Sequence, residues 1–280
     1  MSVLQNKIDF AAVLRVKHAN PNGDPLNGNR PRTDYNGLGE ITDVCVKRKI
    51  RDRLQDAGLN IFVQSDDRKN DGATSLRDRA EKALGKKFDP GETRKLACEK
   101  WVDVRAFGQL FALPKKGKQK GDEGEDDKSV SIPIRGPVTV QSAFSVQPVE
   151  ITSTQITKSV NSEGDGTKRG ADTMGMKHRV DEGIYVFYGS MNPQLAERTG
   201  FSDADAEEIK KVLPKLFEND ASSARPEGSM EVLKVVWWKH NSKAGQYSSA
   251  KVHRTLSVAP DGGIALASLE GLQPEEIDGF

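Results

Sequence analysis

The chain contains few of the residues that build the most easily recognised kinds of site. It has only two cysteines among 280 residues, Cys45 and Cys98, which excludes a disulfide framework and a cysteine-based zinc site. Its four histidines are scattered and form no HxxxH or His/Cys cluster of the kind that binds a metal. Because P-loop and GxGxxG patterns are also missing, a metabolic enzyme that binds a nucleotide through a glycine-rich loop is a remote alternative.

Long apolar segments are missing too. No run approaches the roughly 18–20 apolar residues that cross a bilayer, and Lys7 and Asp9 interrupt any signal-peptide core near the N-terminus. Apolar residues make up 35% of the chain and charged residues 30%, which is typical of a globular protein with a modest core and long polar excursions. We therefore expect a cytoplasmic protein with no membrane segment.

Charge is unevenly distributed along the chain. The net charge is only +1, which by itself argues against a nucleic-acid-binding protein. Residues 1–113, however, carry a net charge of +5, residues 114–180 a net of +2 and residues 181–280 a net of −6. This asymmetry fits either a protein with a basic and an acidic face, whose copies attract one another head to tail, or a merely solvated acidic C-terminal part.

A glycine- and asparagine-rich loop followed by a basic helix is the most informative stretch of the chain. Residues 19–53 read ANPNGDPLNGNRPRTDYNGLGEITDVCVKRKIRDR. Gly and Asn tolerate positive φ, so such a loop can expose backbone N–H groups. Five cations then fall within seven positions: Lys47, Arg48, Lys49, Arg51 and Arg53. The combination suits a phosphate backbone better than a small neutral ligand.

The basic stretch has the pattern of an amphipathic helix over 44–57, capped by Thr42 or Asp43. A solvated face with internal ion pairs, such as Asp43 with Lys47, would account for one or two of its cations. Five cations in seven positions are more than such pairs explain, and they favour phosphate contacts by this helix. Lys49 and Arg53 are expected to face solvent or a neighbouring subunit.

Other patterns predict an α+β fold. Strands are expected at 8–16, 59–63, 183–191, 230–240 and 251–258, extended structure at 130–156, helices at 75–84, 92–101 and 203–218, and a strand with or without a short preceding helix at 102–113. Strands at 149–159 and 174–180 would form a long hairpin with a glycine-rich tip at 161–172. The low-complexity stretch 114–129 is expected to be a disordered loop. The order of elements fits a ferredoxin-like βαββαβ sheet with large insertions.

Seven short motifs together resemble those of a known family. They are NPNGDP at 20–25, PRTD at 31–34, TDVCVKRKIR at 42–51, WVDVRAFG at 101–108, IRGPV at 134–138, TMGMKHRV at 173–180 and GIYVFYGSMNP at 183–193. In this order they resemble the backbone subunit of the CRISPR Cascade complex, specifically of type I-C. The resemblance covers nearly the whole chain.

The resemblance implies a hand-shaped, guide-RNA-binding protein of the RAMP superfamily. A modified RRM-like, ferredoxin-like palm would span 1–280, with a finger-like helical insertion at 65–100 and a thumb hairpin at 149–180. Copies would polymerise along one CRISPR RNA guide, and each thumb would displace a guide base, so that target DNA pairs in short segments. The implied partners are the guide RNA, further copies of the chain, other Cascade subunits and, through the guide, target DNA. No cofactor and no enzymatic activity are implied.

The resemblance, with the patterns above, assigns RNA binding to residues of the loop, the basic helix and the thumb; in the family, the helix that matches 44–57 contacts guide phosphates. The assigned residues are Asn20, Asn22, Gly23, Arg30, Arg32, Lys47, Arg48, Arg51, Met174, Met176, Lys177, His178 and Arg179. On an exposed hairpin, a pair of flexible methionines could be the wedge for a displaced base, although methionine pairs are more often core residues. Of Trp237 and Trp238, one is expected in the core and the other at an inter-subunit surface.

A metal-dependent endoribonuclease is the alternative. Backbone subunits of the related type III complexes cut target RNA with a loop aspartate, and Asp24 and Asp34 lie in the loop here. Loop aspartates more often cap turns. We expect no catalytic residue and no metal ligand.

Overall fold

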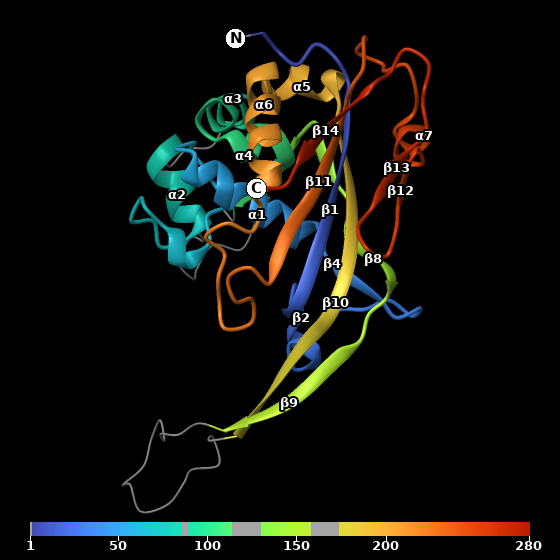
Figure 1. The fold of residues 1–280 in the computed structure, drawn as a ribbon. Coiled ribbons are helices and arrows are strands. Elements are labelled where there is room, and N and C mark those ends of the chain that lie inside the picture. The colour runs from blue at the N-terminus through green and yellow to red at the C-terminus, as the bar shows by residue number, and fades with distance from the viewer. Residues whose placement is uncertain (1, 86–88, 114–129, 158–173) are drawn as a thin grey trace, which may run out of the picture.

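The fold is built on one antiparallel sheet from which a long hairpin projects (Figure 1). The computed structural model describes residues 2–85, 89–113, 130–157 and 174–280. The sheet order is β14 (Pro274–Asp278), β11 (Met230–Lys239), β1 (Ile8–Ala19), β10 (Met174–Met191), β8 (Ala143–Pro148) and β4 (Leu38–Ile41). Two further strands, β7 (Val138–Val140) and β9 (Ile151–Thr157), also pair with β10.

Helices connect these strands in the ferredoxin-like order. α1 (Asp43–Asp56) lies between β1 and β8 in the chain, directly after β4, and α5 (Pro193–Thr199) and α6 (Asp203–Val212) lie between β10 and β11. Reading β1, α1, β8, β10, α6 and β11 as βαββαβ places the four strands in the order β11-β1-β10-β8, with each neighbouring pair antiparallel. The α+β prediction with a ferredoxin-like palm is confirmed.

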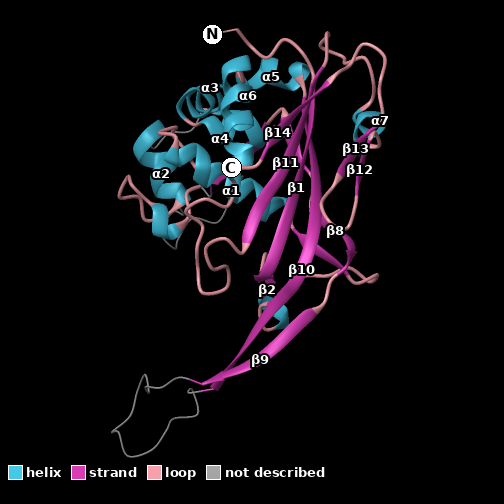
Figure 2. Cartoon of the chain, in the orientation of Figure 1, coloured by secondary structure: helices cyan, strands magenta, loops and turns pink. Residues whose placement is uncertain are grey.

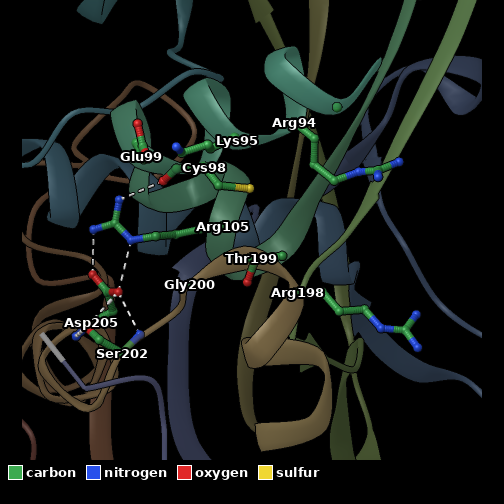
Figure 3. A pocket seen from close by; sticks show the side chains of 11 residues that line it. Arg94, Lys95, Cys98, Glu99, Arg105, Arg198, Thr199, Gly200, Ser202 and Asp205 are labelled. Atoms are coloured by element: carbon green, nitrogen blue, oxygen red, sulfur yellow. Dashed lines mark hydrogen bonds and ion pairs between the residues drawn. The ribbon is translucent and has the colours of Figure 1, made fainter. Parts of the chain in front are cut away.

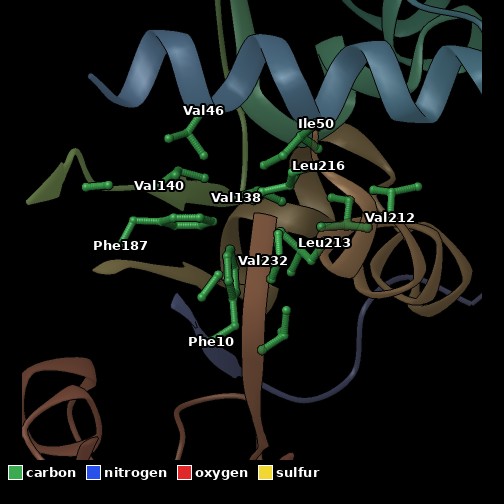
Figure 4. Close-up of a cluster of buried hydrophobic side chains, with 14 of the residues drawn as sticks. Phe10, Val46, Ile50, Val138, Val140, Phe187, Val212, Leu213, Leu216 and Val232 are labelled. Carbon is green, nitrogen blue, oxygen red and sulfur yellow. The ribbon is translucent and has the colours of Figure 1, made fainter. Parts of the chain in front are cut away.

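The main core lies between this sheet and its helices. α1 begins at the N-cap Thr42, whose hydroxyl accepts a hydrogen bond from the Cys45 N–H. Its apolar stripe then meets the sheet, and Figure 4 shows Val46 and Ile50 above Phe187. On the same face, Phe10 stacks on Trp237 with ring centroids 5.6 Å apart. The helix spacing predicted from the sequence therefore positions α1, and with it the basic residues.

A smaller apolar cluster lies beside the palm. It is formed by α2 (Leu76–Leu84), α3 (Pro90–Lys100), α4 (Val102–Phe107), β5 (Gly108–Leu113) and β6 (Val130–Arg135). Phe62 is at its centre, in contact with Trp101 and Phe111. The short helix expected as one alternative before a strand at 102–113 is α4, so that version of the prediction is confirmed.

The other face of the sheet is covered by the segment after β11. This segment contains α7 (Ser249–His253) and a hairpin of β12 (Leu256–Val258) and β13 (Ile264–Leu266). Trp237 and Trp238 point to opposite faces of β11, and both are buried. The prediction that one of them faces another subunit is therefore wrong, because this segment covers the second tryptophan.

A buried polar cluster ties that segment to the sheet. Asp9 on β1 is fully buried, and its Oδ2 lies 2.9 Å from His240 Nε2 and 3.2 Å from Lys7 Nζ. His253 Nε2 lies 3.6 Å from Asp9 Oδ1 and 3.2 Å from the Gly189 carbonyl oxygen. Asp9 Oδ2 is thus paired, as a buried charge requires, whereas Oδ1 has no hydrogen-bond partner among the described residues.

Two of the strands expected from the sequence, at 59–63 and 251–258, do not form as predicted. Residues 59–63 form no strand, and 251–258 divides into the end of α7 and β12. The N–H groups of Phe62 and Val63 donate to the Asp103 carboxylate at 2.7 and 3.1 Å instead of to a neighbouring strand. β14, which the sequence reading did not predict, completes the edge of the sheet.

The projecting hairpin consists of β9 and the first half of β10, and Figure 2 shows it extending away from the helices. The two strands lie within the ranges predicted for a hairpin, and their pairing runs from Ile151 with Val180 to Thr157 with Met174. The expected disordered loop at 114–129 and the hairpin tip at 161–172 lie outside the described residues. Within the described residues, no helix has the length and apolar character needed to cross a membrane.

Candidate nucleic-acid interface

The loop after β1 folds back on itself and pairs its own backbone, so it does not present a row of free backbone N–H groups. It contains the two-residue strands β2 (Gly23–Asp24) and β3 (Arg30–Pro31), joined by the 3₁₀ turn η1 (Pro25–Asn27). A Cβ on Gly23 would lie 2.9 Å from the Asn29 carbonyl oxygen, so glycine is required for this close approach. The loop is therefore a preformed platform.

The two candidate asparagines hold this platform in place. Asn22 Oδ1 accepts hydrogen bonds from the backbone N–H and the hydroxyl of Thr42, both at 2.9 Å. Asn20 is buried, and its side-chain amide donates to the Asn29 carbonyl. These contacts give both residues structural roles and join the loop to the start of α1. Contact of Asn20, Asn22 and Gly23 with RNA stays a prediction.

The loop carboxylates cap turns. Asp24 accepts a hydrogen bond from the Leu26 N–H at 3.2 Å and forms an ion pair with Arg32 at 3.3 Å. Asp34 Oδ1 accepts from the N–H groups of Asn36 and Leu38, at 2.8 and 2.9 Å. Both aspartates thus cap turns, which is the alternative to catalysis given above for aspartates in this loop. Among the described residues, no three His, Cys, Asp or Glu side chains form a group that could hold a metal ion.

The cations of α1 are mostly paired within the protein. Lys47 Nζ lies 2.9 Å from the Asp43 carboxylate, which is the i,i+4 ion pair predicted by the alternative of a solvated helix face. Arg51 Nε donates to the buried Asp103 at 3.0 Å, and its guanidinium lies over the Phe107 ring. Arg48 is the exception, since about half of its side chain is exposed and its two carboxylate contacts are long.

The expectation for Lys49 and Arg53 is wrong. We assigned both to solvent or to another subunit, but both are buried. Lys49 pairs with Asp220, and Arg53 with Asp56 at 3.1 Å. Burial lowers the pKa of Lys49, although Asp220 opposes this effect. A count of cations along a sequence does not show which carboxylates the fold will bring to them.

A groove of about 360 Å³ runs along the first turns of α1. It brings Asn22, Arg48 and Arg51 together, as the sequence predicts for one binding surface. Gln64 and Ser65 form part of its wall. The sequence did not predict these two polar residues as part of the site, because 59–63 was expected to form a strand and no binding role was assigned to the residues that follow it. The groove presents one half-exposed cation next to amide and hydroxyl groups, an arrangement that can bind a phosphate and the adjoining sugar.

The base of the hairpin is bound to the loop. Arg30 donates to the Ser153 hydroxyl at 2.9 Å, and the same hydroxyl lies 2.8 Å from His178 Nδ1. Arg179 pairs with Asp181 at 3.3 Å. The structure therefore brings Arg30 of the loop next to His178 of the hairpin, two predicted residues that are far apart in sequence.

The methionines of the hairpin are exposed. Met174 and Met176 have exposed fractions of 62% and 55%. Because side chains alternate along a strand, these two residues share a face of β10 with His178, and Lys177 and Arg179 lie on the other face. The core alternative for the methionine pair is therefore excluded for this chain.

Comparison with known proteins supports the family of the resemblance noted above. The family described as CRISPR-associated protein Cas7 matches residues 6–273. The chain belongs to this family. A curated relative from Haloferax volcanii, described as CRISPR-associated protein Cas7, is 29% identical over 276 residues, which span 95% of this chain and 79% of the relative.

Two solved structures are also similar to this Cas7-family chain. A chain of a "CRISPR RNA-guided surveillance complex, pre-nicking" has a TM-score of 0.49 and 17% identity, and the match covers 83% of this chain and 75% of that one. A chain of a "CRISPR RNA-guided surveillance complex" has a TM-score of 0.45 and 17% identity, with coverages of 95% and 77%.

Proposed function

We propose that this Cas7-family chain is a guide-RNA-binding backbone subunit of a type I-C Cascade surveillance complex. One observation carries the proposal: the Arg30–Ser153–His178 contacts join the loop to the base of an exposed hairpin. A strand of RNA lying along the loop would therefore also meet the hairpin. The type I-C motifs listed above support the subtype, and the family supports the CRISPR setting.

Binding would occur mainly through phosphates and sugars. A subunit that covers variable guide sequences gains nothing from reading bases, and backbone contacts are independent of sequence. Arg48, Arg30 and Lys177 would supply charge, and the wall at Gln64 and Ser65 would supply neutral donors. Lys47 and Arg51 contribute less because their carboxylate partners already neutralise them.

The hairpin would act as a thumb over the guide. Met174 and Met176 present flexible apolar side chains at the end of the described hairpin. A thioether chain of this kind can insert beside a base and adapt to its shape. Unstacking one base per subunit would divide the guide into short segments for pairing with target DNA.

The proposed role is that of a scaffold, with no catalysis. Its partners would be guide RNA, other copies of the chain and other Cascade subunits, in the cytoplasm. The alternative is a metal-dependent target-RNA endoribonuclease that uses Asp24 or Asp34. The turn-capping contacts of both carboxylates favour the scaffold. Incubation with target RNA and Mg²⁺ separates the two roles: cleavage that Asp24→Ala or Asp34→Ala abolishes would establish the nuclease.

The central experiment measures guide binding by the full chain. The double substitution Arg30→Ala, Arg48→Ala should weaken binding similarly for unrelated guide sequences. It should also flatten the log–log salt dependence by about two units, roughly one for each lost phosphate contact. Arg254→Ala is the matched control, since Arg254 is exposed and lies on the segment behind the sheet. Equal loss in both variants, or loss for one guide sequence alone, would contradict the proposal.

A further inference from the structure

A cavity of about 630 Å³ lies at the opposite end of the molecule from the hairpin. Its walls come from α3 and α5, and its floor from the start of α6 and from Arg105 of α4 (Figure 3). No residue of the loop and no described residue of the hairpin in the candidate nucleic-acid interface lines it. The proposed guide-binding function does not use this cavity.

Three cations line the cavity without carboxylate partners among the described residues. Arg94 and Lys95 belong to α3 and Arg198 belongs to α5, so they stand on two walls (Figure 3). None of them forms an ion pair with a described residue, whereas every cation of α1 does. Arg94 makes one long hydrogen bond, 3.3 Å to the Pro133 carbonyl. The guanidinium groups of Arg94 and Arg198 are thus available to a ligand.

The carboxylates of the cavity do not neutralise these cations. Asp205 is already bound by Arg105 through two hydrogen bonds of 2.9 and 2.6 Å and by the Ser202 N–H and hydroxyl. Burial would raise the pKa of Asp205, but these bonds hold it below its ordinary value, so the carboxylate stays charged and balances Arg105. Glu99 is the other acidic residue of the lining. Four cations against two carboxylates leave a net charge of +2.

A buried hydroxyl also lacks a partner. Thr199 is only 6% exposed, it lines the cavity, and its Oγ1 makes no hydrogen bond with any residue that the structure describes. A polar atom without a partner inside a protein is costly, and such groups usually find a partner in a ligand or in water. Thr199 thus offers a hydrogen-bond donor within the cation-rimmed cavity.

We infer that this cavity binds a phosphate monoester. A phosphate monoester carries about −1.5 to −2 charges at neutral pH, which matches the net +2 of the lining, whereas a carboxylate or a phosphodiester carries only −1. Guanidinium groups from facing walls match the oxygen pairs of a phosphate. The volume exceeds that of a phosphate alone and leaves room for the group that carries it. Among the described residues that line the cavity there is no aromatic side chain, so the recognition inferred here rests on the phosphate rather than on a base.

The first test uses small probes and the full chain. Calorimetry should detect methyl phosphate but should find dimethyl phosphate bound at least about tenfold more weakly, because the diester has lost one charge. Arg94→Ala with Arg198→Ala should reduce methyl phosphate affinity roughly tenfold or more, since each replacement removes a charge-assisted hydrogen bond. Thr199→Val keeps the shape of the side chain and should reduce affinity severalfold. Arg254→Ala should leave affinity unchanged.

A second arm identifies what carries the phosphate. A nucleoside 5′-monophosphate is compared with its nucleoside, and a 5′-phosphorylated oligonucleotide with its 5′-hydroxyl form. The difference between the two oligonucleotides isolates the terminal phosphate from binding elsewhere on the chain. If the phosphorylated member of one pair binds more tightly than its unphosphorylated partner, and the double arginine variant loses this difference, the site is supported. The pair that shows the difference identifies the molecule that carries the phosphate. No methyl phosphate binding by the wild type, equal affinity for the diester, or unchanged affinity in a folded double arginine variant would overturn the inference.

Discussion

At the scale of single residues, the basic helix contains two kinds of arginine. Arg51 is 12% exposed and binds the buried Asp103 carboxylate, which also accepts from two backbone N–H groups. Arg48 is 49% exposed and makes two long ion pairs. The sequence predicted both as phosphate ligands because a run of cations contains no information about distant carboxylates. Asp103 is 52 positions from Arg51, and only the fold brings the two side chains together.

These two arginines should therefore respond differently to substitution. Arg51→Ala leaves a buried carboxylate with one partner fewer and should lower the free energy of unfolding by about 2–4 kcal/mol. Arg48→Ala removes only surface contacts, so its change should stay within about 1 kcal/mol, while guide affinity falls. Urea denaturation and RNA binding, measured on each variant, check the contrast. A destabilised Arg48→Ala protein would show that its long ion pairs matter more than their exposure indicates.

The buried histidine on α7 predicts a pH dependence of stability. Burial lowers the pKa of His253, an effect that the nearby Asp9 carboxylate only partly opposes. The unfolded chain, with a histidine pKa of about 6.5, then binds more protons than the folded chain at mildly acidic pH. Stability should therefore be lost as pH falls through about 6.5.

His253→Gln should reduce this dependence. The measurement is the free energy of unfolding in urea at about pH 7.5 and about pH 5.5 for both proteins, and the variant should show the smaller difference. His18→Gln is the control, because the His18 side chain is 55% exposed. The assignment to His253 would be lost if the control changed the pH difference as much as the buried substitution did.

At the scale of elements, the sequence was most informative where a local signal and the tertiary environment agree. Thr42, Ser75 and Ser202 each cap a helix that the sequence predicted, because a side-chain cap is a local interaction. Residues 59–63 have the apolar content of a strand, yet their N–H groups bind Asp103 instead. β14 has mostly polar residues, and its place at the sheet edge depends on pairing with β11. Pairing between strands that are far apart in the sequence cannot be predicted from a short stretch of residues.

The hairpin provides a prediction at this scale. Replacing Met174 and Met176 together with Asp should leave the thermal midpoint nearly unchanged, because both side chains are exposed. Guide-bound assemblies should still form, but target DNA affinity should fall at least about tenfold, because an acidic side chain cannot insert beside a base and repels phosphates.

Ile156 offers a matched control on the same hairpin. It pairs with Gly175, so its side chain lies on the opposite face from both methionines, and it is also exposed. Ile156→Asp makes the same apolar-to-acidic change and should keep most of the target affinity. Equal losses for the two faces would mean that added negative charge, rather than removal of the methionines, is responsible.

At the scale of the whole molecule, the uneven charge bears on how copies assemble. The net +5 of residues 1–113 and the net −6 of residues 181–280 would attract one another between neighbouring copies along a guide. Many of these charges are paired within the chain, as on α1, so attraction between copies should be weak without RNA. The guide would then be the component that holds the copies together.

The chain co-expressed with a CRISPR array should accordingly purify as a large ribonucleoprotein containing several copies. Ribonuclease treatment should return it to small species, because contacts between copies without the guide are weak. Raising the salt from about 50 to about 200 mM should shift the equilibrium in the same direction, since both guide binding and the attraction between copies are electrostatic. Sedimentation velocity with absorbance at two wavelengths measures size and RNA content together. A nucleic-acid-free monomer under all conditions would contradict the scaffold role, whereas a large assembly that survives ribonuclease would place the main cohesion between the protein copies themselves.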